Sequence, residues 1–418
     1  MITFTELFLL FVGLSSTIKF NIVGELYVPD IVSILIIPLF LPRIRFIKLR
    51  GAGGVLILFG ALWLLNQMIT DAYQLTQLSD LARGWAKIVF FFLNALGLAL
   101  ISAGRLRPLL FFLVGNAVAI VLQAAFFPTE FQQGGLDFND GAWKFGYAPG
   151  LTTLAAIFGT SRLAFRLFGV WGESLPLLVL GIVNLAFNYR SMFGTAIAAV
   201  AFGLLKRAID RSPRLRTKVT PIIFGALVAG GMLFAQTLMV VYGAAAGNGM
   251  LGIAAQEKYE AQSGGDLNLL QSGRMESLVS TRAIADSPIL GHGSWARDVT
   301  YVAMLRDILE SKGMNVSSFV IEDDLIPSHS YLLGAWVEAG VMGGVFWSAI
   351  EIVSLAALYR TLKVTDAPGT ALAFILFLLI WATLFSPFGS SARFIVPAQI
   401  GCVLWILEEL PNTRNRKT

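Results

Sequence analysis

Apolar stretches separated by short polar segments follow one another along almost the whole chain. A helix that crosses a bilayer needs about 20 mostly apolar residues, and the pattern predicts about 12 such helices. The predicted spans are residues 4–18, 27–42, 52–69, 85–103, 108–127, 146–161, 171–188, 192–206, 219–243, 330–358, 369–386 and 392–408. Lipid offers no hydrogen-bond partners to the backbone, and the runs are too long and too uniformly apolar for barrel strands. The pattern therefore predicts an all-α polytopic membrane protein.

The composition agrees with this pattern. Only 14% of the 418 residues are charged and the mean hydropathy is +0.72, which excludes an ordinary water-soluble fold. The single Cys402 lies in the last apolar run and excludes an internal disulfide framework. The first stretch, MITFTELFLLFVGLSS, lacks a basic leader, so we expect a first span rather than a removed signal peptide. The segment DAYQLTQLSDLARGW (71–85) is too polar to span and predicts a surface or re-entrant helix.

Basic residues gather in alternate loops. They fill the loops 43–50, 105–107, 162–166 and 206–218 and the C-terminal tail NTRNRKT. Short cytoplasmic loops collect Lys and Arg, and in a twelve-span arrangement all five segments fall on one side. Both termini are therefore expected in the cytoplasm. The net charge of +5 follows from this topology and does not indicate nucleic-acid binding.

The chain divides into three parts by the same pattern. Residues 1–243 hold the first nine predicted spans, residues 244–329 form one large polar loop with short helices, and residues 330–418 hold the last three spans and a tail. The polar loop falls on the side opposite the basic loops. We therefore expect most of the extracytoplasmic chemistry in the loop.

Two arginines lie on the outer side against the usual charge rule. Arg190 sits in the short turn FNYRSMFG between the seventh and eighth spans, and Arg393 opens the twelfth span in GSSARFIVP. An arginine at the membrane surface costs up to about 3 kcal/mol unless its side chain snorkels or finds an anion. Each arginine is therefore expected either to snorkel to headgroup phosphates or to bind an anion.

Two further arginines belong to a predicted helix over residues 273–286 in the polar loop. Arg274 and Arg282 are eight residues apart, which places them about 80° apart around the helix and about 12 Å apart along it. They could flank one extended anion. Alternatively, Glu276 and Asp286 hold them in surface salt bridges.

The chain contains two histidines, one in a loop after a predicted helix and one at the start of a predicted helix. His292 stands between two glycines in PILGHGSW and is expected in a loop, with contact to a substrate as the alternative. For His329, Ser328 reads as the N-cap of the tenth span, which puts the ring in the first turn. The positive end of the helix dipole favours a neutral imidazole there, which can accept a proton. The alternative is a histidine exposed at the interface.

Three sequence blocks carry a family resemblance. YRSMFGTAIAAVAFGLL, SGRMESLVSTRAIADSPILGHGSW and HSYLLGAWVEAGVMGGVFW together resemble the O-antigen ligase and O-antigen polymerase superfamily of bacterial envelope glycosyltransferases. The blocks cover the C-terminal half in the order and spacing of the family, and the first half is similar only in hydropathy. The resemblance implies a GT-C-like fold in the bacterial inner membrane, with the large loop and the active site in the periplasm.

The resemblance also implies a reaction and its residues. Such enzymes transfer a glycan from undecaprenyl pyrophosphate to an acceptor hydroxyl. The family has arginines that are thought to bind the pyrophosphate, and their positions match Arg190, Arg274 and Arg282. The family also has a histidine at the end of the large loop, and its position matches His329. The family often has Ser-Arg-Gly or Ser-Arg-Thr in the first block, whereas here Arg190 precedes Ser191. The match of Arg190 is thus less direct than the others.

No cofactor is expected, although the acidic cluster at Glu322, Asp323 and Asp324 leaves a divalent metal open. Adjacent residues do not converge easily on one ion, and the resemblance favours a reaction without metal. The favoured function is polymerisation of O-antigen or exopolysaccharide repeat units, because GHGSWARD and HSYLLGAWVEAG are closer to polymerases. Ligation of finished polymer to lipid A core uses the same chemistry. A transporter or flippase would instead have mid-membrane charges and inverted repeats, and a chain-length regulator as partner stays open.

Overall fold

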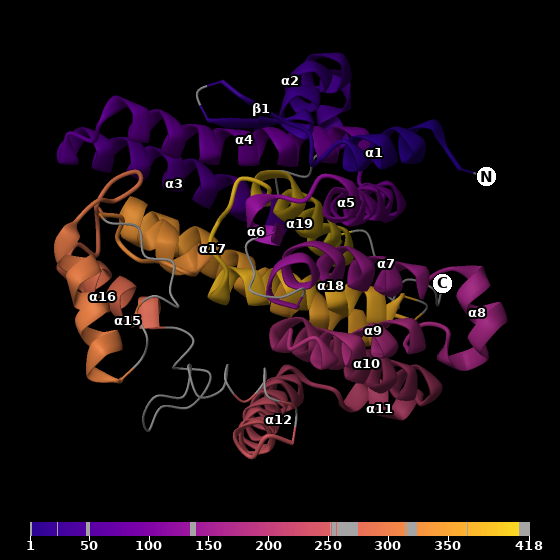
Figure 1. Cartoon of the computed structure of the whole chain (residues 1–418). Helices are drawn as coiled ribbons and strands as arrows, with labels where there is room; N and C mark the ends of the chain where they lie inside the picture. Colours follow the sequence, from indigo (N-terminus) through magenta and orange to yellow (C-terminus); the bar gives the residue numbers. More distant parts are fainter. Residues whose placement is uncertain are drawn as a thin grey trace.

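A computed structural model describes residues 2–22, 24–46, 51–133, 139–250, 252, 256, 275–313, 316, 324–365 and 367–408. It is a bundle of α-helices with one small antiparallel hairpin (Figure 1). The elements are α1 Phe4–Leu14, β1 Lys19–Asn21, β2 Glu25–Tyr27, α2 Val28–Phe40, η1 Leu41–Phe46, α3 Gly51–Gln74, α4 Leu78–Ser102, α5 Leu106–Phe126, α6 Glu130–Gln133, η2 Asn139–Tyr147, α7 Ala148–Phe158, α8 Arg162–Phe168, η3 Gly169–Trp171, α9 Leu175–Ala186, α10 Arg190–Arg211, α11 Pro213–Lys218, α12 Pro221–Gly247, α15 Met275–Asp286, α16 Val299–Ser311, α17 Tyr331–Lys363, α18 Gly369–Phe385 and α19 Ala392–Glu408.

Each of the twelve predicted spans coincides with an apolar helix in the described part of the chain. Five of these helices, α3, α4, α5, α10 and α17, are long and apolar enough to cross a membrane. A sixth span results if the bent pair 141–158 and 162–171, which turns by 85°, crosses as one unit. The structure thus agrees with an all-α membrane protein. That the shorter helices also cross stays a prediction.

The described parts of the predicted basic loops lie at one end of the bundle, which we call the basic end. Trp405 near the end of α19 lines a shallow pocket with Arg105 and Arg107 at the start of α5. Further contacts join Glu6 to Arg107 (3.3 Å), Gly53 N to Glu408 (3.3 Å), Arg207 to Glu173 (3.5 Å) and Lys363 to the Arg216 carbonyl (2.7 Å). The opposite end, the far end, holds the turn before α10, the start of α17 and the turn between α18 and α19.

The predicted surface or re-entrant helix over 71–85 is wrong. Helix α3 continues to Gln74 and α4 begins at Leu78, so these polar residues belong to the ends of two long helices. Helix α3 is 24 residues long, which makes it about 36 Å and longer than an apolar layer of about 30 Å. Polar residues therefore fit at its last turns without a separate helix.

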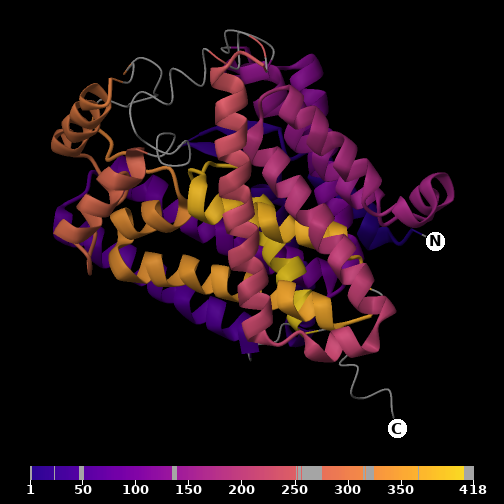
Figure 2. The ribbon, with the colours of Figure 1, turned by 90° about the horizontal axis from the view of Figure 1, so that it is seen from below.

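Helix α17 is broken near its start and folds back on itself. Ala339 (φ −115°, ψ 16°) and Gly340 (φ 58°, ψ −155°) leave the helical conformation. The rings of Tyr331 and Trp347 lie 5.0 Å apart, although 16 residues of straight helix would separate them by about 24 Å along the axis. We call residues 331–338 the arm and residues 331–349 the α17 hairpin (Figure 2). The prediction of one uninterrupted span over 330–358 is therefore wrong in its first third.

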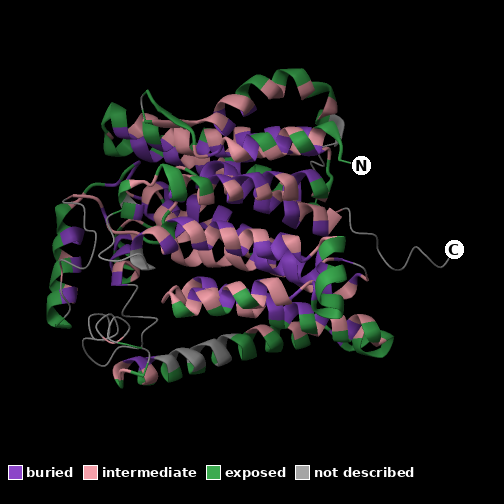
Figure 3. Cartoon of the chain, turned by 45° about the vertical axis from the view of Figure 1, so that its right-hand side comes forward, coloured by how far each residue is buried: buried purple, intermediate pink, exposed green. Residues whose placement is uncertain are grey.

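Two apolar clusters hold these elements together. The larger fills the centre of the bundle and includes a group of stacked and edge-on rings from Trp63, Phe91, Phe346 and Trp347. The smaller lies under α15 and α16 and reaches Val337 in the arm. Buried residues concentrate in the middle of the bundle, whereas α12 exposes much of its described surface (Figure 3).

Candidate functional site

His329 lies immediately before the arm, not inside its first turn as predicted. The N-cap of α17 is Ser330, whose hydroxyl accepts from Leu333 N at 3.1 Å. The same hydroxyl donates to the Thr383 carbonyl at 2.8 Å, which anchors the start of the arm to the end of α18. The prediction of Ser328 as the cap is therefore wrong by two residues. His329 is exposed, and the argument from the first-turn dipole no longer applies to its ring.

Arg190 is the first residue of α10 and lies at the same end of the bundle as His329. Helix α10 runs antiparallel to α18, because the Phe202 and Phe377 rings lie 6.2 Å apart and Gly203 packs directly against Thr370. From Gly203 back to Arg190 is about 20 Å of helix, the same rise as from Thr370 to Thr383. Arg190 is therefore level with Thr383, the residue whose carbonyl receives the hydrogen bond from the start of the arm.

Helix α15 lies beside the residues that precede His329. Buried Ser280 donates to the Pro327 carbonyl at 2.7 Å, two residues before His329. The predicted helix ends at Asp286 as expected, and its described part begins at Met275. Arg274 lies outside the described residues. The structure thus brings the helix of Arg282 next to the segment of His329.

The salt-bridge alternative for Arg282 is present in the structure. Its Nε donates to Asp286 at 3.0 Å, and its side chain is 62% exposed. An exposed pair of this kind contributes roughly 0.2–1 kcal/mol, so a bound anion can displace it at little cost. Arg282 is therefore held loosely and remains accessible to a ligand.

His292 is a loop residue, as predicted, and its ring has a structural partner. Its Nε2 lies 2.8 Å from the Ala283 carbonyl, and its backbone N donates to the Val337 carbonyl at 2.7 Å. The ring also meets Tyr301 edge-on at 5.5 Å. These contacts give His292 a role in joining α15, α16 and the arm.

A polar face at the end of α3 is a part of the site region that sequence reasoning missed. Its side chains are Asn66, Gln67, Thr70, Asp71 and Gln74. They point at the loop 287–294 and at the tip of the α17 hairpin. The sequence did contain an indication of this face. Successive members are one, three, one and three residues apart, and this spacing puts them on one side of a helix. Only two of them, Asp71 and Gln74, belong to the polar segment 71–85.

The structure describes only part of the acidic cluster that was considered as a possible site for a divalent metal. Glu322 and Asp323 lie outside the described residues. Asp324 forms a two-pronged pair with Arg297 Nη1 (2.7 and 2.8 Å), and Arg297 Nε donates to Asp80 at 2.8 Å. The hydrogen bonds to Asp80 and Asp324 raise the pKa of Arg297 still further above its usual range. Among the residues that the structure describes, no group of three His, Cys, Asp or Glu side chains could hold a metal ion.

Arg393, the other outer arginine, is bound to a carboxylate inside the bundle. It is 7% exposed, and its Nη2 donates to Asp30 at 2.8 Å and to the Glu25 carbonyl at 2.7 Å. Asn94 Nδ2 also donates to Asp30, at 2.7 Å. Arg393 therefore does not snorkel to headgroups, and the anion that it binds is the buried carboxylate of Asp30.

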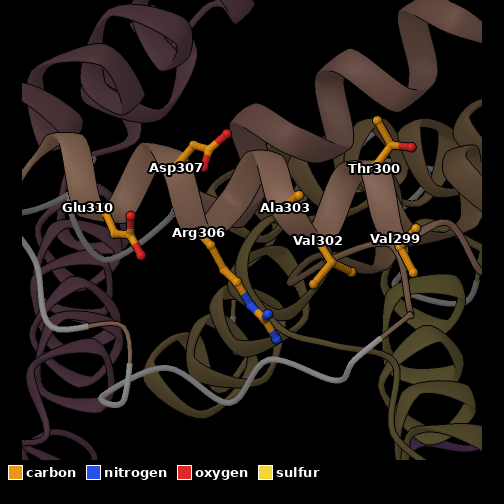
Figure 4. A pocket seen from close by; sticks show the side chains of 7 residues that line it. All are labelled: Val299, Thr300, Val302, Ala303, Arg306, Asp307 and Glu310. Carbon is orange, nitrogen blue, oxygen red and sulfur yellow. The ribbon is translucent and has the colours of Figure 1, made fainter.

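A shallow groove of about 500 Å³ lies along the outer face of α16 (Figure 4). Its lining residues are Val299, Thr300, Val302, Ala303, Arg306, Asp307 and Glu310. None of the described residues predicted for pyrophosphate or acceptor chemistry, Arg190, Arg282 and His329, lines it. Comparisons with known proteins do not identify a function either, because no protein-family model and no curated protein matches the chain.

Proposed function

We propose that this chain transfers a glycan from an undecaprenyl-pyrophosphate-linked donor to an acceptor hydroxyl at the far end of the bundle. The observation that carries this proposal is the fold-back of the α17 hairpin. It returns His329 to the end of α18, level with Arg190 and beside the helix of Arg282. One end of the membrane bundle thus offers two guanidinium groups and an exposed imidazole.

The arginines are suited to a pyrophosphate leaving group. As the bond from the anomeric carbon to the phosphate oxygen breaks, negative charge grows on the pyrophosphate. Guanidinium groups bind phosphate oxygens with paired, charge-assisted hydrogen bonds, and a well-aimed donor contributes roughly 3 kcal/mol to such a transition state. Arg190 and Arg282 take this role, with Arg274 as the third predicted member.

His329 is suited to accept the proton of the acceptor. The acceptor oxygen forms a bond to the anomeric carbon while the bond to the pyrophosphate breaks on the opposite side. The hydroxyl proton moves to an imidazole nitrogen of His329, and the configuration at the anomeric carbon inverts. A well-placed base contributes about two to four powers of ten to the rate.

The position of the basic end supports a specific orientation. If the loops rich in Lys and Arg lie in the cytoplasm, both termini are cytoplasmic and the far end faces the periplasm of the bacterial inner membrane. A lipid-linked donor that has crossed to the outer leaflet would present its pyrophosphate at that level. Accessibility of single cysteines placed in the basic loops and in loop 287–294 tests this orientation.

A transfer assay with the purified chain in liposomes tests the reaction. With a lipid-pyrophosphate-linked repeat unit as donor and acceptor, the native chain is expected to form longer glycans and release undecaprenyl pyrophosphate. His329→Ala lowers the rate at least a hundredfold by the loss of the base, and added imidazole restores part of it. Undiminished transfer by His329→Ala would remove the histidine from the reaction.

The arginine role has a matched control on the same polar loop. Arg282→Ala is expected to raise the donor concentration needed for half-maximal rate, whereas Arg306→Ala in the α16 groove leaves it unchanged. Both arginines lie on short helices of the predicted polar loop. Equal effects of the two substitutions would contradict a specific pyrophosphate site at Arg282.

The acceptor separates the polymerase from the ligase. A strain without a polymerase is expected to accumulate single lipid-linked repeats, whereas a strain without a ligase accumulates long lipid-linked chains that never reach lipid A core. We favour polymerisation of O-antigen or exopolysaccharide repeats, on the loop blocks given above. A flippase would instead move the donor across the liposome membrane without forming a new glycosidic bond.

A further inference from the structure

Asp71 lies at the centre of a cage of neutral hydrogen-bond donors. It is 1% exposed, at the far-end limit of α3. Its Oδ1 accepts from Ser294 N (2.6 Å) and Thr76 Oγ1 (3.0 Å), and its Oδ2 accepts from Ser294 Oγ (2.7 Å) and Trp85 Nε1 (2.7 Å). One carboxylate therefore joins α3, the turn after it, α4 and the loop 287–294.

The loop 287–294 is bound along its whole length by α3 and by the α17 hairpin. Side chains of α3 donate to its carbonyls: Asn66 to Ile289, Thr70 to Leu290 and Gln74 to Gly291. Its own N–H groups donate to the hairpin tip: His292 to Val337 (2.7 Å) and Gly293 to Glu338 (3.0 Å). The loop is thus an adaptor between α3 and the tip of the hairpin.

Glycines make this close contact possible. A Cβ at Gly291 would lie 2.5 Å from Gly340 N, and Gly291 also has φ +85°. A Cβ at Gly293 (φ +91°) would lie 2.6 Å from Thr76 Oγ1 and 3.2 Å from Asp71 Oδ1. The backbone approach at both faces of the loop therefore depends on residues without side chains.

We propose that Asp71 is a positioning residue of the transfer site, because it locks loop 287–294 against the α17 hairpin, which begins two residues after His329. This inference rests on the proposed function. The loop follows directly after α15, which holds Arg282, and binds the tip of the arm that begins after His329. Asp71 thereby fixes the base and the pyrophosphate-binding helix relative to each other without touching the substrate.

The substitution Asp71→Asn tests the cage with little change in size. One oxygen becomes an NH₂ group, which faces one hydroxyl and one N–H donor. The hydroxyl can turn to accept from the NH₂ group, but the N–H of Ser294 or Trp85 loses its acceptor. Loss of the lock is expected to lower the turnover number about a hundredfold, the effect typical of a misplacement of about 1 Å. The concentration of donor at half-maximal rate is expected to change far less.

Two readouts separate positioning from a general loss of structure. The rate of the native chain is expected to fall as His329 becomes protonated at low pH, and Asp71→Asn should abolish this dependence. In addition, Asp71→Asn should cause no further loss in a chain that already carries His329→Ala. Full turnover in Asp71→Asn, or losses that multiply in the double variant, would overturn the proposal.

A second pair of variants decides the matter if Asp71→Asn does not fold. Ser294→Ala and Trp85→Phe each remove one 2.7 Å hydrogen bond to Asp71 Oδ2, but only Ser294 belongs to the loop. We expect Ser294→Ala to lower turnover at least tenfold more than Trp85→Phe. Equal effects of the two variants would overturn the proposal.

A labelling measurement keeps this inference separate from the reaction itself. In a chain with Cys402→Ser, a cysteine placed by His329→Cys is labelled with a maleimide, with and without Ser294→Ala. A changed labelling rate supports the coupling even if the native chain transfers no glycan, in which case only the proposed function fails. An unchanged rate contradicts the coupling whatever the chain catalyses.

Discussion

Gly340 is the residue at which the α17 hairpin turns, and Gly340→Ala tests the fold-back directly. Its conformation (φ 58°, ψ −155°) is one that side chains rarely adopt, and imposing it on alanine costs roughly 1–3 kcal/mol. A Cβ there would also lie 2.0 Å from the Ile289 carbonyl oxygen. That oxygen accepts from Val341 N (3.2 Å) and Asn66 Nδ2 (3.1 Å), and each lost bond costs about 1 kcal/mol.

Together these effects predict that Gly340→Ala lowers the free energy of unfolding by about 3–5 kcal/mol. Denaturant unfolding in detergent micelles, followed by tryptophan fluorescence, measures the change. The control is Gly230→Ala in α12, where a Cβ meets nothing within 4 Å and alanine favours the helix. If Gly340→Ala is as stable as the control and transfers glycan at the native rate, the fold-back does not position His329.

Three further outcomes are expected. Asp30→Ala leaves Arg393 buried without its carboxylate and is expected to lower the free energy of unfolding by about 3–5 kcal/mol. Adding Arg393→Met is expected to recover much of this loss. Equal stability of the single and double variants would contradict a stabilising ion pair between Asp30 and Arg393. Burial and a hydrogen bond to Asp286 raise the pKa of Tyr301 from 10.0 to about 12. The stabilisation from the protonated phenol is complete below pH 10 and is lost as the pH rises towards 12, so unfolding midpoints of Tyr301→Phe should fall less over this range than those of the native chain. EDTA is expected to leave the transfer rate unchanged, and restoration of a lost rate by magnesium would show that the reaction uses a metal.

The helices were predictable from hydropathy, but their interruption was not. The apolar periodicity of α15 and its stop after Asp286 gave the end of that helix correctly. The stretch EAGVMGG contains mostly apolar and small residues, which are typical of a membrane-spanning helix. Its composition therefore predicts a continuous helix and does not indicate where the backbone turns. The break at Ala339 and Gly340 depends on the Ile289 carbonyl, some 50 residues away in the chain, which fills the space at the turn.

The other incorrect predictions concern residues whose positions depend on contacts with distant parts of the chain. Ser328 and Ser330 are equally good caps by residue type, and Ser330 is selected because its hydroxyl also reaches Thr383. Arg393 was correctly identified as an arginine in need of a partner, but its partner Asp30 is 363 residues away. The polar face of α3 around Asp71 could have been found from helical spacing, since all its members are within nine residues.

The most direct test of the whole account is a structure of the chain in lipid nanodiscs with the lipid-pyrophosphate-linked donor bound. We expect the pyrophosphate at the far end, within hydrogen-bond distance of the guanidinium groups of Arg190 and Arg282, and the anomeric carbon facing the space beside His329. A donor bound at the basic end, or a pyrophosphate that contacts neither arginine, would contradict the account.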